Sequence, residues 1–225
     1  MIQGLFGGTF NPLHRGHLAV ILHVKETFNL NTIHLIPSAI PPHKPTTNLA
    51  PARDRFEMVK ESVADIHGLV ASDVEILRRG PSFTIDTVQH FINTTPRTTE
   101  LRLIVGSDAF FEMNTWKRGR ALFSLIPTIV MIRPGEEKQA EDIASFLQNM
   151  ISDNYRPADG GNFFSAPIAS DPDSKSGVKP VYVCKVPEID ISSTLIRQRI
   201  KLHLPVAALV PKPVEEIISQ RGLYL

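Results

Sequence analysis

The N-terminal stretch MIQGLFGGTFNPLHRGHLAVILHV, residues 1–24, combines an apolar run, a glycine turn and an amphipathic segment. Residues 2–6 are short and apolar and lead into two glycines, which is typical of a buried strand. Helical spacing then places Val20, Ile21 and Val24 on one face of the segment that follows. The sequence therefore opens on a strand that leads through a turn into a helix.

The same alternation continues along the chain. Further short apolar runs predict strands at residues 32–36, 101–105, 128–132 and 181–184. Amphipathic stretches predict helices at residues 15–29, 51–65, 84–94, 137–151, 192–202 and 211–220. Strands that alternate with helices imply right-handed crossovers and a mainly parallel sheet with helices on both faces. We therefore expect a Rossmann-like, doubly wound α/β fold with a small C-terminal helical segment at residues 192–225.

Two irregular stretches interrupt this order. Residues 37–50 are rich in proline and cannot form a helix, and we expect them to form a substrate loop. Residues 153–180 are rich in Gly, Pro, Ser and Asp and predict a long irregular loop, which is usually functional or disordered. Neither stretch is a clean linker, so we expect residues 1–225 to form a single domain.

Composition excludes several classes of function. The net charge of +1 argues against nucleic acid as the main partner, although a small anionic ligand remains compatible with it. The single cysteine, Cys184, cannot form an internal disulfide, which favours a reducing compartment. No segment has the apolar length of a membrane span, and the N-terminus lacks the basic region of a signal peptide. A cytoplasmic protein with no membrane partner is expected; its oligomeric state is left open, a homo-oligomer included.

The first turn carries residues suited to binding phosphate. In open parallel sheets, ligands bind at the carboxyl ends of strands, which is where this turn lies. Gly7 and Gly8 allow the backbone to approach a phosphate, Thr9 adds a hydroxyl, and the helix N-terminus adds N–H groups and partial positive charge. His14 and His17 can donate hydrogen bonds to oxygens that gain charge during a reaction.

Each part of this motif also has a structural interpretation. Two glycines after a strand can be a simple tight turn, and Asn11-Pro12 is an ordinary turn pair. The two histidines also suit a core, a surface or a zinc site, but zinc is disfavoured because no cysteine cluster could complete it. The Gly-Lys-Ser/Thr ending of a Walker loop is missing. Taken as a whole, residues 7–18 favour function.

A second motif, ISSTLIR at residues 191–197, lies near the other end of the chain. Its hydroxyl residues mark a helix start and leave backbone donors exposed there. Arg197 follows Ser193 by four residues and Thr194 by three, so the three share a helix face. The guanidinium suits bidentate binding of phosphate. A capped helix with a solvated arginine is the open alternative.

Together, GGTFNPLHRGH and ISSTLIR resemble the motifs of the nucleotidyltransferases that transfer AMP or CMP from a nucleoside triphosphate. Other segments extend the resemblance, collinearly over essentially the whole chain, to the bacterial nicotinate-nucleotide adenylyltransferase family. These segments are Pro41-Pro42-His43-Lys44, Pro81-Ser82-Phe83-Thr84, Val105-Gly106-Ser107-Asp108, Thr115-Trp116, Arg133-Pro134-Gly135, Leu209-Val210-Pro211 and Gly222-Leu223-Tyr224. Asn11 departs from the pattern, because many relatives carry Asp there, so no metal-binding carboxylate is carried over and no protein metal site is expected.

The resemblance implies an enzyme of NAD biosynthesis that transfers AMP from ATP, bound with Mg²⁺ as cofactor, to nicotinate mononucleotide. The products would be nicotinate adenine dinucleotide and pyrophosphate. The acceptor phosphate already carries about 1.5 to 2 negative charges near neutral pH, so it needs no general base. The protein would align the substrates and neutralise charge, as in other phosphoryl transfers.

The resemblance also implies roles for the residues at matching positions. The catalytic residues would be His14, His17 and Arg197. The ATP-binding residues would be Gly7, Gly8, Thr9, Phe10, Gly106, Asp108, Ser193, Thr194 and Arg197. For Asp108, a helix N-cap is an equally good interpretation of the local sequence.

On the acceptor side, the resemblance places the nicotinate ring against Trp116 and its carboxylate near Thr84. His43 and Lys44 would reach the acceptor phosphate from the proline-rich loop, which we expect to close over the site. Arg133 belongs to the same acceptor set. A core tryptophan and a solvated lysine are the alternatives for Trp116 and Lys44.

Two competing functions stay open. A sister adenylyltransferase would use nicotinamide mononucleotide or phosphopantetheine as the acceptor, and residue types do not separate the first of these from nicotinate mononucleotide. A non-catalytic nucleotide-binding module on the same fold is the other, since fold alone does not establish function. The intact set of His14, His17 and Arg197 argues against a module without activity.

Overall fold

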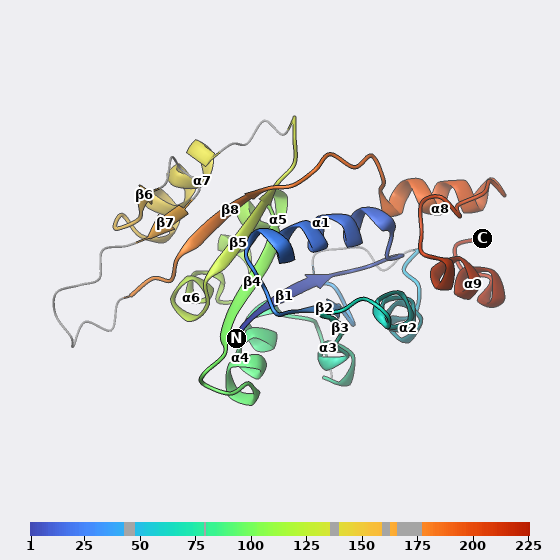
Figure 1. Cartoon of the computed structure of the whole chain (residues 1–225), viewed down its shortest axis with the longest axis horizontal. Coiled ribbons are helices and arrows are strands. Elements are labelled where there is room, and N and C mark those ends of the chain that lie inside the picture. The colour runs from blue at the N-terminus through green and yellow to red at the C-terminus, as the bar shows by residue number, and fades with distance from the viewer. Residues whose placement is uncertain (43–47, 79, 136–139, 159–162, 166–176) are drawn as a thin grey trace. The chain divides into compact units, whose positions relative to one another are not determined.

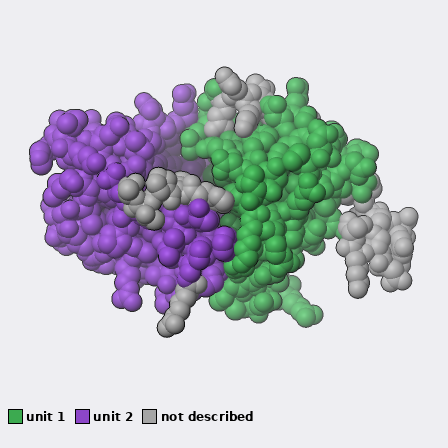
Figure 2. All heavy atoms as spheres, turned by 180° about the vertical axis from the view of Figure 1, so that it is seen from behind, with its two compact units in different colours: residues 1–4, 84–187 green, residues 5–83, 188–225 purple. Residues whose placement is uncertain are grey.

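The computed structural model describes residues 1–42, 48–78, 80–135, 140–158, 163–165 and 177–225. Contacts divide the chain into two compact units (Figure 2). Unit 1 consists of Met1–Gly4 and Thr84–Pro187, and unit 2 of Leu5–Phe83 and Glu188–Leu225. A single domain over residues 1–225 stays a prediction.

Unit 2 contains both sequence motifs, and Figure 1 labels its helices and strands. Its strands have the order β3-β2-β1, and β2 runs parallel to β3 with Ile33 opposite Leu69. The strands are β1 (Ile2–Gly8), whose first residues belong to unit 1, β2 (Thr32–Pro37) and β3 (Leu69–Ala71). The helices are α1 (Arg15–Thr27), α2 (Ala52–Val63), α3 (Val74–Leu77), α8 (Ser193–Lys201) and α9 (Lys212–Arg221).

Unit 1 has strands in the order β4-β5-β8-β7-β6. The first three, β4 (Glu100–Gly106), β5 (Thr128–Ile132) and β8 (Val181–Lys185), are parallel, whereas β7 (Phe163–Ser165) and β6 (Arg156–Ala158) are antiparallel. The helices are α4 (Thr84–Thr94), α5 (Ser107–Glu112), α6 (Gly119–Leu125) and α7 (Ala140–Phe146), with a 3₁₀ turn at Met113–Thr115 and a π turn at Leu147–Ile151.

The cores follow from the sequence patterns. In unit 2, the apolar face of α1 buries Ile21 and Val24 completely, and Met58 and Val59 of α2 are equally buried. In unit 1, every residue of β5 is buried, as expected for a parallel strand covered on both faces. Cys184 is buried in β8, which fits a small core residue.

The expected α/β fold with mainly parallel strands is confirmed, and each strand and helix predicted from periodicity has a counterpart among the described residues. Of the helix predicted at residues 137–151, residues 137–139 lie outside the described ranges and Leu147–Ile151 forms a π turn. The structure differs from the expected irregular loop at residues 153–180, because β6 and β7 lie there. Three residues per strand are too few for a period-2 signal, so the sequence pattern could not reveal them. Over the described residues, none of the helices has both the length and the apolar character that crossing a bilayer requires.

Candidate active site

The turn after β1 brings Phe10 back over the strand end. Phe10 is buried and has a φ of 46°, an uncommon left-handed conformation for a residue other than glycine. A Cβ atom on Gly8 would lie 2.8 Å from the Phe10 ring, so only glycine fits beneath it. A Cβ on Gly7 would meet no atom within 4 Å. Packing therefore requires glycine at position 8, whereas position 7 borders open space.

Replacing Gly8 with alanine tests this packing. We expect the change to push the Phe10 ring away and to lower the free energy of unfolding by about 1–3 kcal/mol, the usual cost of overpacking. Gly7→Ala, the matched control, should change it by about 0.5 kcal/mol or less. Urea unfolding measures both, and equal effects of the two variants would contradict the packing argument.

His14 and His17 form a reciprocal cap at the start of α1. Nδ1 of His14 accepts a hydrogen bond from the His17 backbone N–H at 3.3 Å, and Nδ1 of His17 accepts one from the His14 N–H at 3.3 Å. The arrangement is a capping box made from two imidazoles. Because each Nδ1 acts as an acceptor, each neutral ring carries its proton on Nε2.

The two imidazoles are also packed tightly. Their rings are stacked with centroids 3.6 Å apart and an interplanar angle of 27°, and the Phe10 ring lies edge-on to His17. His14 is buried and His17 half-buried. A Cβ on Gly16 would lie 3.0 Å from Nδ1 of His14, so the glycine makes room for that ring. The histidine pair is thus held by backbone and by neighbouring rings.

The second motif is bound directly to the first within unit 2. Ser192 caps α8 by accepting a hydrogen bond from the Leu195 N–H at 3.1 Å. The Ser193 hydroxyl donates to the Pro12 carbonyl at 3.0 Å. Nη1 of Arg197 donates to the Asn11 carbonyl at 2.8 Å, and Nη2 donates to the Thr194 hydroxyl at 3.2 Å. The structure therefore brings together the residues that the sequence assigned to the triphosphate.

Sequence reasoning missed Arg55, which lies under the first turn with none of its surface exposed. Its guanidinium donates to the carbonyls of Thr9 at 2.7 Å, Ala50 at 2.9 Å and Ala39 at 3.1 Å. Burial lowers the pKa of Arg55, but an arginine remains cationic near neutral pH. A signal was available, because Arg55 precedes the buried Met58 by three residues and so lies on the apolar face of α2.

Asn11 and Tyr224 were also missed as partners. The Asn11 side chain donates to the Asn48 carbonyl at 2.8 Å and accepts from the Ala50 N–H at 3.0 Å and from the Tyr224 hydroxyl at 2.8 Å. A carboxylate could accept the last two bonds but could not donate the first. In the described structure, the amide at this position therefore has a use that aspartate would not fully serve.

Three predicted residues lie at strand ends in unit 1. Gly106 is the last residue of β4 and Asp108 lies two residues beyond it, while Arg133 directly follows the parallel neighbour β5. The N-cap of α5 is Gly106 and Asp108 stands in the first turn, so the N-cap interpretation of Asp108 is wrong. Asp108 is exposed and accepts a hydrogen bond from the Ser107 hydroxyl at 3.3 Å. Arg133 is exposed as well.

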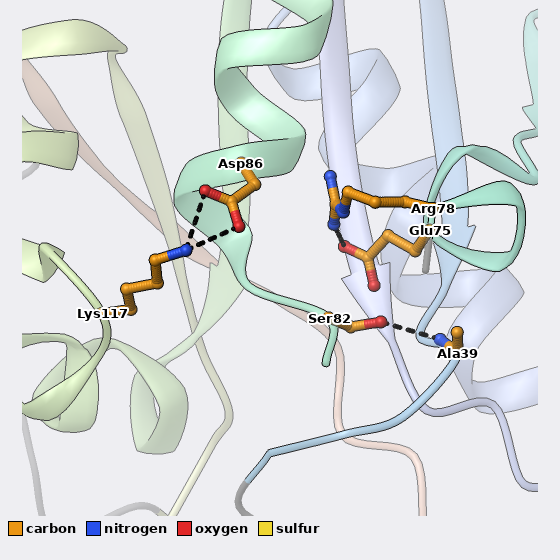
Figure 3. A network of polar contacts seen from close by, with 6 residues as sticks. All are labelled: Ala39, Glu75, Arg78, Ser82, Asp86 and Lys117. Carbon is orange, nitrogen blue, oxygen red and sulfur yellow. Dashed lines mark hydrogen bonds and ion pairs between the residues drawn. The ribbon is translucent and has the colours of Figure 1, made fainter. Parts of the chain in front are cut away.

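The segments that carry Thr84 and Trp116 are connected by an ion pair between nearby residues. Lys117 pairs with Asp86 of α4, with Nζ 3.0 Å from one carboxylate oxygen and 3.3 Å from the other (Figure 3). Thr84 begins that helix and Trp116 precedes Lys117, so the pair ties the two segments together within unit 1. Trp116 is half-buried, which does not fit a fully buried core tryptophan.

The proline-rich segment is described only at its two ends. At one end, the Ser82 hydroxyl accepts a hydrogen bond from the Ala39 N–H at 2.8 Å (Figure 3). At the other end, Asn48 and Ala50 are bound by Asn11 and Arg55. His43 and Lys44 lie outside the described residues. Within the described ranges, no group of three or more His, Cys, Asp or Glu side chains could hold a metal ion.

Comparisons with known proteins identify the family of the chain. The cytidylyltransferase-like family model matches residues 5–199. A probable nicotinate-nucleotide adenylyltransferase of Desulfatibacillum aliphaticivorans is 37% identical over 227 residues, covering 100% of both chains. A protein of the same name from Geobacter sp. (strain M21) is 35% identical, covering 100% of this chain and 99% of its own.

Solved structures agree at the level of fold. The Plasmodium falciparum nicotinic acid mononucleotide adenylyltransferase complexed with NaAD matches with a TM-score of 0.71 at 15% identity, covering 99% of this chain and 97% of its own. The full-length relatives place the chain in a narrower group than the family model does. The chain therefore belongs to the cytidylyltransferase-like family and, within it, to the nicotinate-nucleotide adenylyltransferases.

Proposed function

We propose that this protein transfers AMP from ATP to nicotinate mononucleotide, forming nicotinate adenine dinucleotide and pyrophosphate in NAD biosynthesis. The observation that carries the proposal is the direct connection of the two motifs in unit 2. The histidine pair and Arg197 come from opposite ends of the chain and converge on residues 11–17. A triphosphate needs such a concentration of donors and positive charge.

The reaction requires alignment rather than acid–base chemistry. An oxygen of the acceptor phosphate attacks the α-phosphorus of ATP, a P–O bond forms, and the bond from the α-phosphorus to the bridging oxygen breaks. The electron pair of that bond leaves with pyrophosphate, whose added charge is the main electrostatic demand on the protein. The acceptor is already an anion, so no side chain has to remove a proton first.

His14 and His17 meet this demand with two fixed N–H donors. Their Nδ1 atoms are held by the backbone, so the Nε2–H groups are the donors that would bind the α-phosphate and the leaving pyrophosphate oxygens. Because the rings are fixed before substrate arrives, little reorganisation is required in the transition state. Gly7, Gly8, Thr9 and Phe10 would form the backbone of the same triphosphate site.

Ser193, Thr194 and Arg197 would bind the β- and γ-phosphates. Arg197 has five N–H donors, of which the Asn11 carbonyl and the Thr194 hydroxyl each accept one. Its fork can therefore keep its hold on the first turn while it binds phosphate oxygens. Gly106 and Asp108 would line the adenosine site, with Asp108 toward a ribose hydroxyl.

The acceptor site would comprise Thr84, Trp116 and Arg133 of unit 1. The ion pair between Asp86 and Lys117 supports this assignment, because it fixes the segments that carry Thr84 and Trp116. The ring would pack on Trp116, and Thr84 would meet its carboxylate. His43 and Lys44 would bind the acceptor phosphate.

Mg²⁺ would enter as part of the ATP complex. The ion prefers oxygen ligands, most often one or two carboxylates together with substrate phosphates and water. The imidazoles bind backbone through Nδ1, and the Asn11 amide is already bound at both of its ends. These residues do not fit a protein-bound Mg²⁺, so we assign the ion to the triphosphate and its water.

Pyrophosphate release tests the proposal. The protein is supplied with ATP and Mg²⁺ and, in parallel, with nicotinate mononucleotide, nicotinamide mononucleotide or phosphopantetheine. We expect kcat/KM to favour nicotinate mononucleotide by about tenfold or more, because a site that binds a carboxylate discriminates against a neutral amide. Release with another acceptor would overturn the acceptor assignment. No release from folded protein that binds ATP would favour the non-catalytic module.

A further inference from the structure

Four hydrogen bonds converge on Asn11, a residue that is only 9% exposed. Its side chain binds the Asn48 carbonyl, the Ala50 N–H and the Tyr224 hydroxyl, and its own carbonyl accepts from Arg197. The Asn48 carbonyl can only accept a hydrogen bond and the Ala50 N–H can only donate one. These two partners therefore fix which end of the Asn11 amide is nitrogen and which is oxygen. Asn11 thus connects the first motif to Arg197 and to the C-terminal tail.

The tail reaches Asn11 by a sharp reversal at the end of α9. Gly222 ends that helix in the left-handed conformation with a φ of 58°, and the Leu223 N–H returns to the Ile218 carbonyl at 3.1 Å. Tyr224 has a φ of 66°, which is uncommon for a residue with a side chain. Burial raises the pKa of Tyr224, so its hydroxyl stays a donor at neutral pH.

Helix α9 has a fixed position on α2. The apolar face of α9 is buried and consists of Val214, Ile217 and Ile218. At its end, Arg221 pairs with Asp54 at 2.5 Å and with Glu57 at 2.7 Å. A single exposed ion pair contributes little energy, but two ion pairs at one guanidinium fix the orientation of the Arg221 side chain relative to α2. The tail therefore starts from a defined point and delivers its hydroxyl to a defined acceptor.

We infer that the C-terminal tail, residues 222–225, is a positioning element for AMP transfer, because Tyr224 holds Asn11, whose carbonyl holds Arg197. The inference rests on the proposed function. The residue acts through Asn11 and needs no contact with substrate. Its hydroxyl adds a bond that packing alone does not require, since a phenyl ring would fill the same space.

The arrangement of bonds makes the effect specific to catalysis. Without the Tyr224 hydroxyl, the Asn11 side chain keeps its hydrogen bonds to Asn48 and Ala50. It loses the hydrogen bond that ties it to the C-terminal tail. Rotation of the Asn11 peptide would shift the carbonyl that orients Arg197. A displacement of about 1 Å in a reacting constellation can lower the rate about 100-fold, so a partial shift should be visible in kcat.

Tyr224→Phe is the test, with steady-state kinetics of pyrophosphate release measured well below the melting temperature. We expect kcat to fall about tenfold while KM for nicotinate mononucleotide changes by about twofold or less. Tyr182→Phe makes the same chemical change in β8 of unit 1 and should leave kcat within about twofold of the wild type. A Tyr224→Phe variant that matches the control would overturn the inference.

A double-mutant cycle with Asn11→Ala separates positioning from general loss of stability. If Tyr224 acts through Asn11, adding Tyr224→Phe to Asn11→Ala should lower kcat/KM no further, within about twofold. Full multiplication of the two effects would overturn the inference. Thermal melting of each variant checks that the folded fraction is equal in every assay.

ATP binding distinguishes failure of this inference from failure of the proposed function. We expect calorimetry to show weaker ATP binding by Tyr224→Phe, by about threefold, because Arg197 is less well oriented. If the wild type releases no pyrophosphate but Tyr224→Phe still binds ATP more weakly than the wild type does, the proposed function is refuted and the positioning role of Tyr224 is retained. If the wild type is active and Tyr224→Phe has the same kcat and the same ATP affinity, the proposed function is retained and the positioning role is refuted.

Discussion

Replacing His17 with alanine is expected to lower kcat for pyrophosphate release by about 100- to 1,000-fold, the usual effect of losing one preorganised donor to a developing oxyanion. The same change removes the acceptor that caps the His14 N–H. Loss of a cap costs about 1 kcal/mol of stability, which is small beside the catalytic effect. Pyrophosphate release and thermal unfolding, measured on one preparation, separate the two losses.

His17→Glu distinguishes the two roles further. A glutamate at the third helical position can accept the His14 N–H and complete a capping box, and its charge favours a helix N-terminus. We therefore expect near wild-type stability, but kcat as low as in the alanine variant or lower, because a carboxylate repels the triphosphate. His23→Ala, in the same helix, is the matched control and should retain kcat within about twofold. Full activity in His17→Ala would refute the catalytic role.

Replacing Arg55 with methionine is expected to lower the free energy of unfolding by about 3 kcal/mol, because three carbonyls in buried or partly buried hydrogen bonds lose their donor together. The carbonyls belong to Thr9, Ala39 and Ala50, and methionine fills the volume without an N–H group. Removing a buried charge gives back part of its desolvation cost, which keeps the net effect below the sum of three lost bonds. Urea unfolding gives the value.

Arg55→Lys and Arg53→Met complete this experiment. Lysine supplies charge but not the planar fork, so it should recover only part of the loss. Arg53 is exposed in the same helix, and its replacement should change stability by about 0.5 kcal/mol or less. If Arg55→Met unfolds at the same urea concentration as Arg53→Met, the guanidinium does not hold the base of the proline-rich segment.

Local patterns predicted much of the fold and part of the site. The apolar run of β5 and the helical spacing of α1 each carry a period that buried elements impose on any chain. The short β6 and β7 do not, because three residues hold too few repeats. Asp108 shows a second limit, since the local sequence suited an N-cap at this residue, whereas α5 begins at Ser107 and has Gly106 as its N-cap.

By itself, the sequence determined the alternating strands and helices, the two motifs at residues 7–18 and 191–197, and the family resemblance, because each depends on residues close together in the chain or on recognisable patterns. Only the tertiary structure decided that Arg55 supports Thr9, that Arg197 binds Asn11, and that Tyr224 reaches the same residue from 213 positions away. Hydrogen bonds over such separations have no local period. They depend on where packing of the apolar faces places each backbone segment, and that placement exists only in the folded chain.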